Sequence, residues 1–237
     1  MTESIETKDA QQVPAVRRPL TRERILHVGL QLIDQWGLES FTMRKLAQEL
    51  GVDPMSLYRH FENKEALLDG VADVLWSEVK LPESRVGWEA LLRSFATSLR
   101  ALAHAHPHAY ALLCKNQSLS LALLRLCDVA LEQLQRAGFA QRRAMEILCT
   151  VSSYAMGYAM VELSALAPVP SERAPGEELS DIGRLTQLMR RLPRETPAHL
   201  VEVACVLTNC DMDAQFIFGL DLMLTSLTSR QGRGASL

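Results

Sequence analysis

Four polar side chains that can hydrogen-bond to another molecule lie close together near the start of the chain. They are Ser56, Tyr58, Arg59 and His60, and they follow a turn at Gly51. Hydroxyl, guanidinium and imidazole groups can bond to the base edges and the phosphates of nucleic acid. This grouping therefore favours a surface that binds nucleic acid.

Two short helices on either side of Gly51 must position these side chains. Thr42 is a suitable cap for the first helix, and Asp53 followed by Pro54 is a typical start for the second. The second helix, 54 to about 60, is too short to be stable alone and must lean on its neighbours. Two helices joined by a tight turn form a helix-turn-helix, whose second helix can enter the major groove of DNA.

Three further polar residues flank this motif. Thr42 can place its hydroxyl and amide against a phosphate, and Arg44 lies within reach of the same groove. Lys64 falls in the first turn of the next helix, where a cation is unfavourable without an anionic partner such as a phosphate. Residues 17–64 hold eight Lys and Arg against six Asp and Glu. This excess supports DNA binding only weakly, since any small helical bundle with a tight turn would share the pattern.

The remainder of the chain is expected to be helical, because its apolar residues recur at helical spacing and no strand-like alternation is found. The fold class is predicted to be all-α, with about nine or ten helices. Residues 1–19 form a flexible arm, 20–80 a helix-turn-helix module, 81–230 a larger helical domain and 231–237 a frayed tail. The expected helices span approximately residues 21–37, 42–51, 54–60, 63–79, 88–104, 119–136, 141–166, 182–192, 197–207 and 211–229.

The composition limits the class of protein. The 237 residues are 48% hydrophobic and 22% charged, which is typical of a globular protein. The net charge of −3 excludes a wholly basic nucleic-acid coat protein. The five cysteines form no CxxC pair, so neither a disulfide framework nor a zinc module is expected. No apolar run approaches the ~18 residues of a membrane span, and the N-terminus lacks a signal peptide. A cytoplasmic protein without a membrane partner is predicted.

Two stretches resemble the TetR family of transcriptional regulators. FTMRKLAQELGVDPMSLYRHFENKEALLDGV is similar to the family's DNA-binding module, and DAQFIFGLDLMLTSL to the final helix of a tetracycline-repressor-type C-terminal domain. The resemblance implies a homodimer that binds double-stranded operator DNA with an inverted repeat, and that is released by a small-molecule effector. Most members of the family repress transcription, and activation by this protein stays an open alternative.

The resemblance also assigns roles near the turn. Ser56, Tyr58 and His60 are implied to lie in the groove, with Thr42, Arg44 and Lys64 on the backbone or flanking bases. Met55 stands where tetracycline repressors carry a proline that touches bases, and Arg59 replaces a tryptophan. A different operator sequence is therefore expected.

Two helices are too apolar to serve one core alone. The last helix has one apolar stripe and leaves Phe218 and Leu222 on another, while the long helix carries small residues that allow close approach. The alternative is that both helices are buried within their own subunit. The resemblance implies a four-helix dimer interface, with a two-fold axis that suits a palindromic operator. The predicted interface residues are Ala155, Gly157, Ala159, Phe216, Leu220, Met223 and Leu227.

An effector cavity is expected within residues 88–207. Tyr154 and Tyr158 are four residues apart, so they share a helix face and their hydroxyls could orient a mostly apolar ligand. The alternative is that both are core tyrosines with internal partners. The predicted effector-binding residues are Phe95, Leu99, His104, Tyr110, Leu113, Cys114, Leu131, Tyr154 and Tyr158.

No metal or cofactor is expected. His104, His106 and His108 are close enough to bind a metal, but no carboxylate or cysteine lies at a convincing spacing beside them. The resemblance places the magnesium ligands of tetracycline repressors at Cys114 and Val161, and neither side chain suits that ion. Glu162 is one residue away, on another helix face. A largely apolar effector is therefore predicted instead of a tetracycline chelate.

Two other classes of function were weighed. A helical enzyme is disfavoured, because the sequence has no nucleophile elbow, HExxH motif, glycine-rich phosphate loop or paired carboxylates. A helical protein that binds a small molecule or a partner without DNA is kept open by the weak basicity of the N-terminal module. A steep fall of DNA affinity with salt would argue against it.

Overall fold

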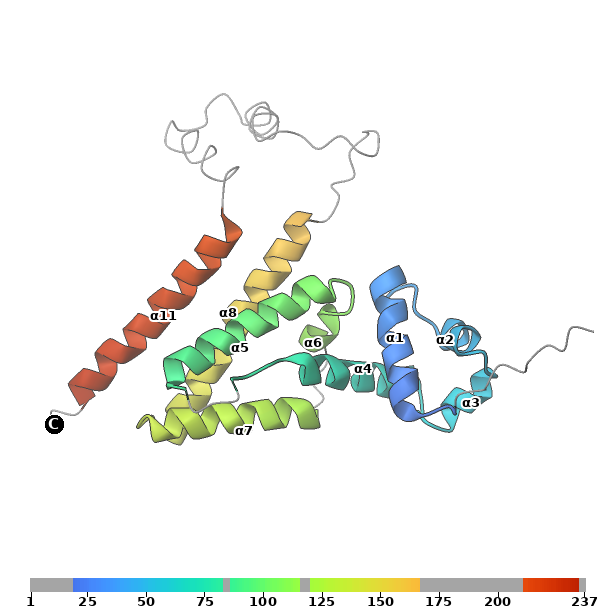
Figure 1. Cartoon of the computed structure of the whole chain (residues 1–237), viewed down its shortest axis with the longest axis horizontal. Coiled ribbons are helices and arrows are strands. Elements are labelled where there is room, and N and C mark those ends of the chain that lie inside the picture. Colours follow the sequence, from blue (N-terminus) through green and yellow to red (C-terminus); the bar gives the residue numbers. More distant parts are fainter. Residues whose placement is uncertain (1–18, 83–85, 116–119, 167–210, 235–237) are drawn as a thin grey trace, which may run out of the picture.

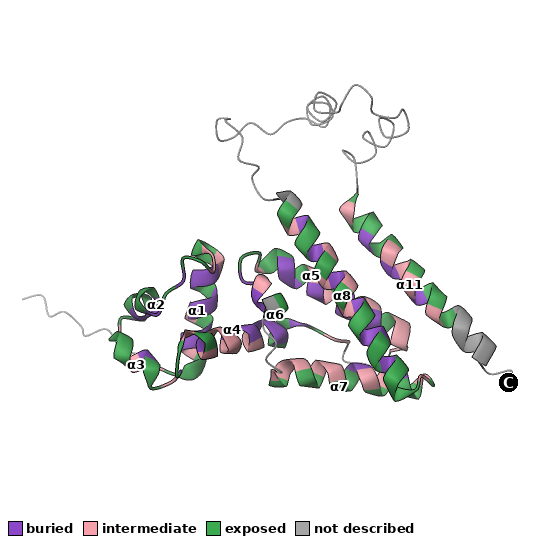
Figure 2. Cartoon of the chain, turned by 180° about the vertical axis from the view of Figure 1, so that it is seen from behind, coloured by how far each residue is buried: buried purple, intermediate pink, exposed green. Residues whose placement is uncertain are grey.

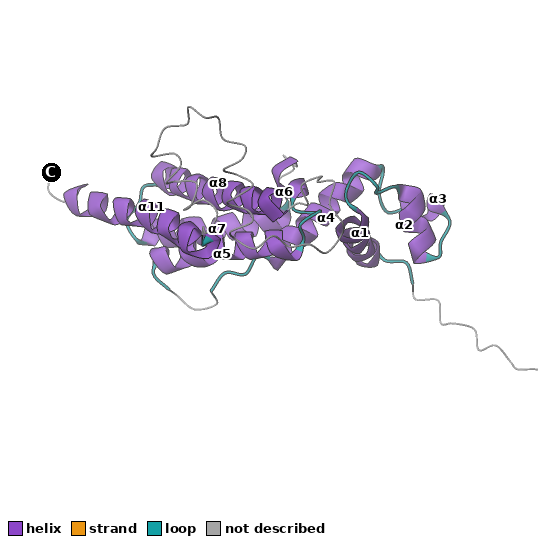
Figure 3. Cartoon of the chain, turned by 90° about the horizontal axis from the view of Figure 1, so that it is seen from above, coloured by secondary structure: helices purple, strands orange, loops and turns teal. Residues whose placement is uncertain are grey.

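The structure, a computed structural model, describes residues 19–82, 86–115, 120–166 and 211–234, with no side chains for Lys115, 165–166 and 229–234. Every regular element in these ranges is an α-helix (Figure 3). The all-α fold class is therefore confirmed for the part of the chain that is described.

Four helices form the N-terminal part, which we call the head (residues 19–79). They are α1 (Arg22–Trp36), α2 (Met43–Leu50), α3 (Pro54–Tyr58) and α4 (Lys64–Glu78). The oxygen atoms of Thr21, Thr42 and Asn63 each accept a hydrogen bond from the backbone N–H three residues further on, at 2.7–3.2 Å. Gly37 and Gly51 end α1 and α2 at φ values of 80° and 67°, which glycine adopts readily. These caps confirm the predicted helix limits.

Five helices form the larger part of the described chain. They are α5 (Trp88–Ala105), α6 (Ala111–Lys115), α7 (Leu121–Arg136), α8 (Gln141–Leu166) and α11 (Met212–Gly234). Helix α5 packs along α8, whose buried face carries Leu148, Val151 and Ala155. Figure 1 shows the head at one end of the molecule and α11 at the other.

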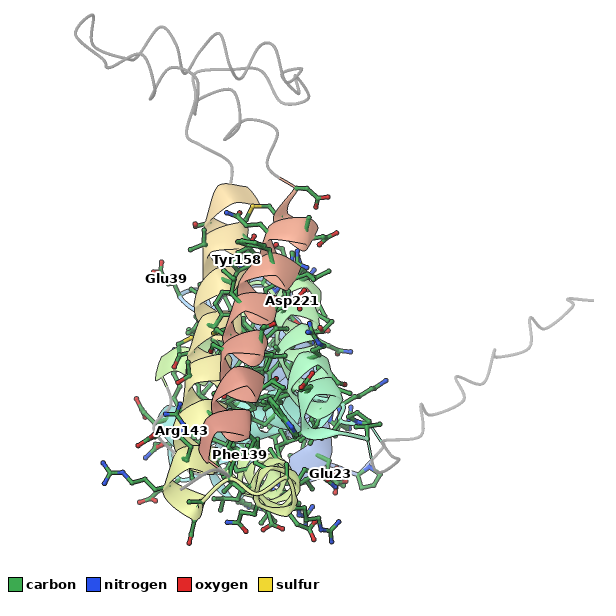
Figure 4. The ribbon with its side chains drawn as sticks, turned by 90° about the vertical axis from the view of Figure 1, so that its left-hand side faces the viewer. Glu23, Glu39, Phe139, Arg143, Tyr158 and Asp221 are labelled. Carbon is green, nitrogen blue, oxygen red and sulfur yellow. The ribbon has the colours of Figure 1, made fainter. Side chains whose placement is uncertain are left out.

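Helix α11 is joined to α5 by a row of polar contacts. Arg93 pairs with Asp221, and the hydroxyl of Thr228 donates to Glu89 at 3.0 Å. Figure 4 shows α8 and α11 side by side, with Tyr158 towards one end of the pair and Arg143 towards the other. Helix α11 is thus fixed between two neighbours that lie far from it in the sequence.

Helix α4 belongs to both parts of the molecule. On one side it packs against α1, and on the other against α6 and α7. A Cβ atom on Gly70 would lie only 2.6 Å from Leu26 Cδ2, so α1 and α4 approach closely. On the other side, the carboxylate of Asp73 accepts the N–H of Ala122 at 3.1 Å, at the start of α7. The predicted domain boundary near residue 80 lies just after this shared helix, and the division itself stays a prediction.

Several helix limits differ from the prediction. Helix α3 ends at Tyr58, because the amides of His60 and Phe61 both bond to the carbonyl of Leu57 and close the turn. The short helix α6 was not predicted, because a segment of only five residues is too short to show a helical periodicity of apolar residues. Helix α11 continues to Gly234, past the expected end near 229 and into the tail expected to fray. The predicted arm up to residue 18, the helices 182–192 and 197–207 and the last three residues lie outside the described part.

Candidate functional site

Helix α3 and the two residues directly after it carry most of the predicted DNA-binding side chains. Asp53 Oδ1 caps it by accepting the N–H of Met55 at 2.8 Å, and Leu57 is fully buried beneath it. Tyr58 is 45% exposed and Met55 69% exposed. Arg59 is also exposed, while Ser56 and His60 are half-buried. Capping and one apolar anchor thus hold a five-residue helix whose outer side faces solvent.

Two predicted phosphate contacts lie at the start of α2. The Thr42 hydroxyl oxygen accepts the N–H of Lys45 at 3.2 Å, which leaves its own hydrogen able to donate to a phosphate. Arg44, two residues further on, is exposed. Figure 1 places α2 and α3 together at the end of the molecule farthest from α11. The structure brings these residues onto one region of the head.

Lys64 lies inside this region rather than on its surface. Its Nζ donates to the carbonyl of Phe41 at 2.8 Å and lies 5.6 Å from the centre of the Phe41 ring. The ammonium therefore holds the start of α4 against the segment that precedes α2. A phosphate contact by Lys64 stays a prediction, with two of its three hydrogens available for it.

Arg22 is a residue of this site that the sequence analysis missed. Its Nη1 donates to the carbonyl of His60 at 2.8 Å, and the guanidinium lies 4.1 Å from the centre of the Phe61 ring. Arg22 thus ties the first turn of α1 to the residues directly after α3. The signal that could have found it is the one used for Lys64, a cation in a first helical turn, where the helix dipole disfavours it.

The predicted dimer residues fall into a buried group and an accessible group. Ala155, Ala159, Phe216 and Leu220 are buried within their own chain, so they offer little surface to a second copy. Gly157 is exposed, and Met223 and Leu227 are half-buried. The large exposed apolar residues described in the two helices are Met145, Met160 and Val161 on α8 and Ile217, Phe218 and Leu222 on α11. Figure 2 shows exposed stretches along both helices.

The two tyrosines predicted to orient an effector bond to α11 instead. The hydroxyl of Tyr154 donates to the carbonyl of Phe216, and that of Tyr158 to the carbonyl of Met212, both at 2.9 Å. Both rings pack on Phe216. This arrangement matches the alternative of internal partners, and an effector contact at these residues stays a prediction.

The other predicted effector residues differ in how far they are buried. Phe95, Leu99, Tyr110 and Leu113 are buried. Leu131 is half-buried, while His104 and Cys114 are exposed. The hydroxyl of Tyr110 is buried and has no partner among the described residues, and burial raises the pKa of Tyr110. A buried hydroxyl without a partner is costly, so this group could receive a ligand or a water.

A charged cluster missed by the sequence analysis lies where α5, α8 and α11 meet. Arg100 Nε donates to Glu162 Oε2 at 2.7 Å, and the same guanidinium pairs with Asp213. Glu162 is only 3% exposed, and His104 Nε2 lies 3.2 Å from it. Burial alone would raise the pKa of Glu162, but the hydrogen bonds from Arg100 and His104 lower it below its usual value. The carboxylate is therefore held ionised inside the molecule.

Two surface hollows lie away from the predicted effector residues. One, of about 370 Å³, is at the start of α5 and includes Trp88 and Arg93. The other, of about 170 Å³, lies between α8 and α11 and includes Thr150 and Met223. Within the described ranges, no three His, Cys, Asp or Glu residues are placed to hold a metal, and no helix could cross a membrane.

Comparison with protein families assigns both parts of the chain. Residues 25–71 match the model of bacterial regulatory proteins of the tetR family. Residues 81–230, more than half of the chain, match that of the tetracyclin repressor-like C-terminal domain. The chain belongs to the TetR family. It is a DNA-binding transcriptional regulator with a helix-turn-helix, of a family that includes effector-binding repressors.

Individual relatives extend this assignment. The tetracycline repressor protein class G of Vibrio anguillarum is 28% identical over 209 residues, covering 86% of this chain and 92% of that one. An HTH-type transcriptional regulator of Saccharopolyspora erythraea is 31% identical over 144 residues, covering 60% of this chain and 61% of that one. The TetR protein ActR of Streptomyces coelicolor, solved with actinorhodin, has a TM-score of 0.75 and 28% identity, covering 91% of this chain and 100% of that one. BioQ, solved with its double-stranded DNA operator, has a TM-score of 0.56 and 25% identity, covering 62% and 90%.

Proposed function

We propose that this TetR-family chain is a homodimeric repressor that binds an inverted-repeat operator through α3 and leaves it when a small, largely apolar effector binds. The observation that carries the proposal is the surface formed by the exposed Tyr58 of α3 and the exposed Arg59 directly after it, next to the buried anchor Leu57. The major groove is about 12 Å wide and admits an α-helix, which would bring Tyr58 at the end of α3 and Arg59 directly after it to the base edges. The solved complex of BioQ with operator DNA supports this use of the fold.

The dimer is supported by the exposed apolar side chains of α8 and α11. Phe218 is 62% exposed, Leu222 59% and Val161 59%. Large apolar side chains grouped on one surface of a chain mark a contact with another protein. We infer that this surface, more than the buried Ala155 and Phe216, meets the second copy. A two-fold axis there would pair two heads for the two halves of an inverted repeat.

The effector is inferred to be something other than a magnesium–tetracycline chelate. The residue at one expected ligand position, Val161, is an exposed aliphatic side chain, and Cys114 is at the other. Glu162 is already paired with Arg100. The buried hydroxyl of Tyr110 offers one polar group inside the hydrophobic core. ActR, which was solved with actinorhodin, supports an organic effector in this fold.

Selection of duplexes from a random DNA pool tests this function. Folded protein is expected to enrich an inverted repeat whose half-sites are about one helical turn apart. Sequencing of the bound pool gives the operator, which then serves to screen effectors for release. Enrichment of one isolated half-site would contradict the dimer, and no enrichment by protein freed of bound ligands would favour the DNA-silent binding protein.

Arg22 and Arg44 are expected to affect DNA binding in different ways. Arg22→Lys should weaken operator binding several-fold, because the guanidinium contacts with His60 and Phe61 that hold the end of α3 are lost while the charge stays.

Arg44→Gln should remove a phosphate contact, and the magnitude of the slope of log affinity against log salt should fall by about 0.9 per subunit. Titrations at several salt concentrations measure both. An unchanged slope in Arg44→Gln would remove Arg44 from the phosphate contacts.

A further inference from the structure

His106 lies where the head meets the larger part of the molecule. It is the residue at the C-terminal end of α5, and its ring faces carboxylates from two other helices. His106 Nδ1 is 2.6 Å from Asp34 Oδ2 on α1, and Nε2 is 3.0 Å from Glu78 Oε2 at the end of α4. The histidine side chain is 17% exposed and that of Asp34 25% exposed. One ring therefore joins the end of α5 to both α1 and α4.

The hydrogen-bond pattern fixes the charge of this ring. An ionised carboxylate oxygen only accepts hydrogen bonds, while a neutral imidazole can donate from only one of its nitrogens. Two carboxylate contacts therefore require both nitrogens to carry a hydrogen, which makes the ring an imidazolium. The second oxygen of Asp34 is buried without a partner among the described residues, so the contact with His106 carries most of the compensation for burying this carboxylate.

The other titratable groups near this junction have different neighbours. On the His106 side, His104 faces Glu162 of α8, and His108 is exposed beside the Gly37 end of α1. From α1 the facing group is Asp34, and from α4 it is Glu78. Burial alone would lower the pKa of His106, but the hydrogen bonds to Asp34 and Glu78 raise it above 6.5. The two carboxylates thus favour the charged form of His106 at the junction.

We propose that His106, as an imidazolium, is the positioning residue through which the larger part of the molecule fixes the orientation of the head. This inference rests on the proposed function, since orientation matters only where two heads bind one DNA duplex. Loss of the charge would release α1 and α4 from the end of α5. Each head would then bind a half-site as before, but the pair would be less often arranged for both half-sites.

The protein alone tests the imidazolium. A group whose pKa is raised in the folded state stabilises it below the unfolded pKa of about 6.5, and that contribution is lost as the pH rises through the folded value. The difference in unfolding midpoint between the wild type and His106→Asn should therefore be largest near about pH 6 and shrink towards about pH 9. His108→Asn is the matched control, because it removes an exposed histidine of the same segment that lies outside the contacts with Asp34 and Glu78. A constant difference for His106→Asn would overturn the proposal.

Operator binding tests the orientation. The probes are the inverted-repeat duplex enriched by the wild type and a duplex that holds one half-site. At about pH 6, His106→Asn should bind the inverted repeat about tenfold more weakly and the half-site within about twofold of the wild type. Asp34→Asn and Glu78→Gln should weaken binding in the same direction.

Three results decide between the two proposals. Equal weakening on both duplexes, or none on either, would overturn the role of His106 in orientation. If no duplex is enriched at all, the proposed function fails, and with it the orientation of heads on DNA. The pH dependence of unfolding would then still show whether the imidazolium ties the three helices together.

Discussion

Tyr58→Ala is expected to weaken binding to the inverted repeat about 100-fold and to leave the unfolding midpoint almost unchanged. A good side-chain contact with a base is worth roughly 1–3 kcal/mol, and a dimer loses two of them. The ring is 45% exposed, while surface substitutions usually change stability by less than about 0.5 kcal/mol. Affinity is measured by titration against labelled duplex, and stability by urea unfolding of the same samples.

Two variants sharpen this experiment. Trp36→Ala removes a 61% exposed aromatic ring from the C-terminal end of α1, whereas Arg22 near the N-terminal end contacts the residues after α3. This variant should leave operator binding unchanged. Tyr58→Phe keeps the ring and removes the hydroxyl, so it separates the contribution of the hydroxyl to affinity from that of the ring. A Tyr58→Ala protein that binds the operator like the wild type would remove Tyr58 from the DNA contacts.

Arg100→Met is expected to lower the free energy of unfolding by about 3–5 kcal/mol, because it leaves the buried carboxylate of Glu162 without its main partner. Arg93→Met is the matched control. Arg93 and Asp221 form a pair whose side chains are 41% and 47% exposed, so its loss should cost at most about 1 kcal/mol. Combining Arg100→Met with Glu162→Leu should recover most of the stability, since the buried charge is then absent. Urea unfolding at neutral pH measures all four proteins.

The pH dependence of the same variant has a predictable sign. In the wild type the pKa of Glu162 lies below 4.5, so its stabilising contribution is lost only as the pH falls through that lowered value. Without Arg100, burial should raise the pKa of Glu162, and acidification from neutral pH should then stabilise the variant. A small loss of stability combined with the wild-type pH dependence would show that Glu162 does not depend on Arg100.

Features encoded by neighbouring residues could be predicted from the sequence. Thr42, Gly51 and Asp53 determine where α2 and α3 begin and end, because capping depends on residues only two to four positions apart. The exposed side of α3 followed from the same local pattern. Helix α6 could not be found this way, since a five-residue helix depends on contacts with the rest of the fold.

Partners that are distant in the sequence could not be predicted. An apolar stripe containing Phe216 shows that a helix face is buried, but not whether its own chain or a second copy covers it. Tyr154 and Tyr158 were placed on one face correctly, yet their acceptors lie 62 and 54 residues away on α11. Asp34 and His106 are 72 residues apart, and neither side chain signals the other in the sequence.

Helix α4 has a consequence for folding. The buried residues Leu67 and Val71 of α4 belong to the same continuous hydrophobic core as Leu92 and Phe95 of α5, so the apolar core of the described chain runs through α4 from the head into the larger part. Local unfolding of either part would expose the other part's apolar surface through this helix. We therefore expect the described helices on both sides of α4 to unfold together, and a fragment cut near residue 80 would expose the face of α4 that packs against α6 and α7.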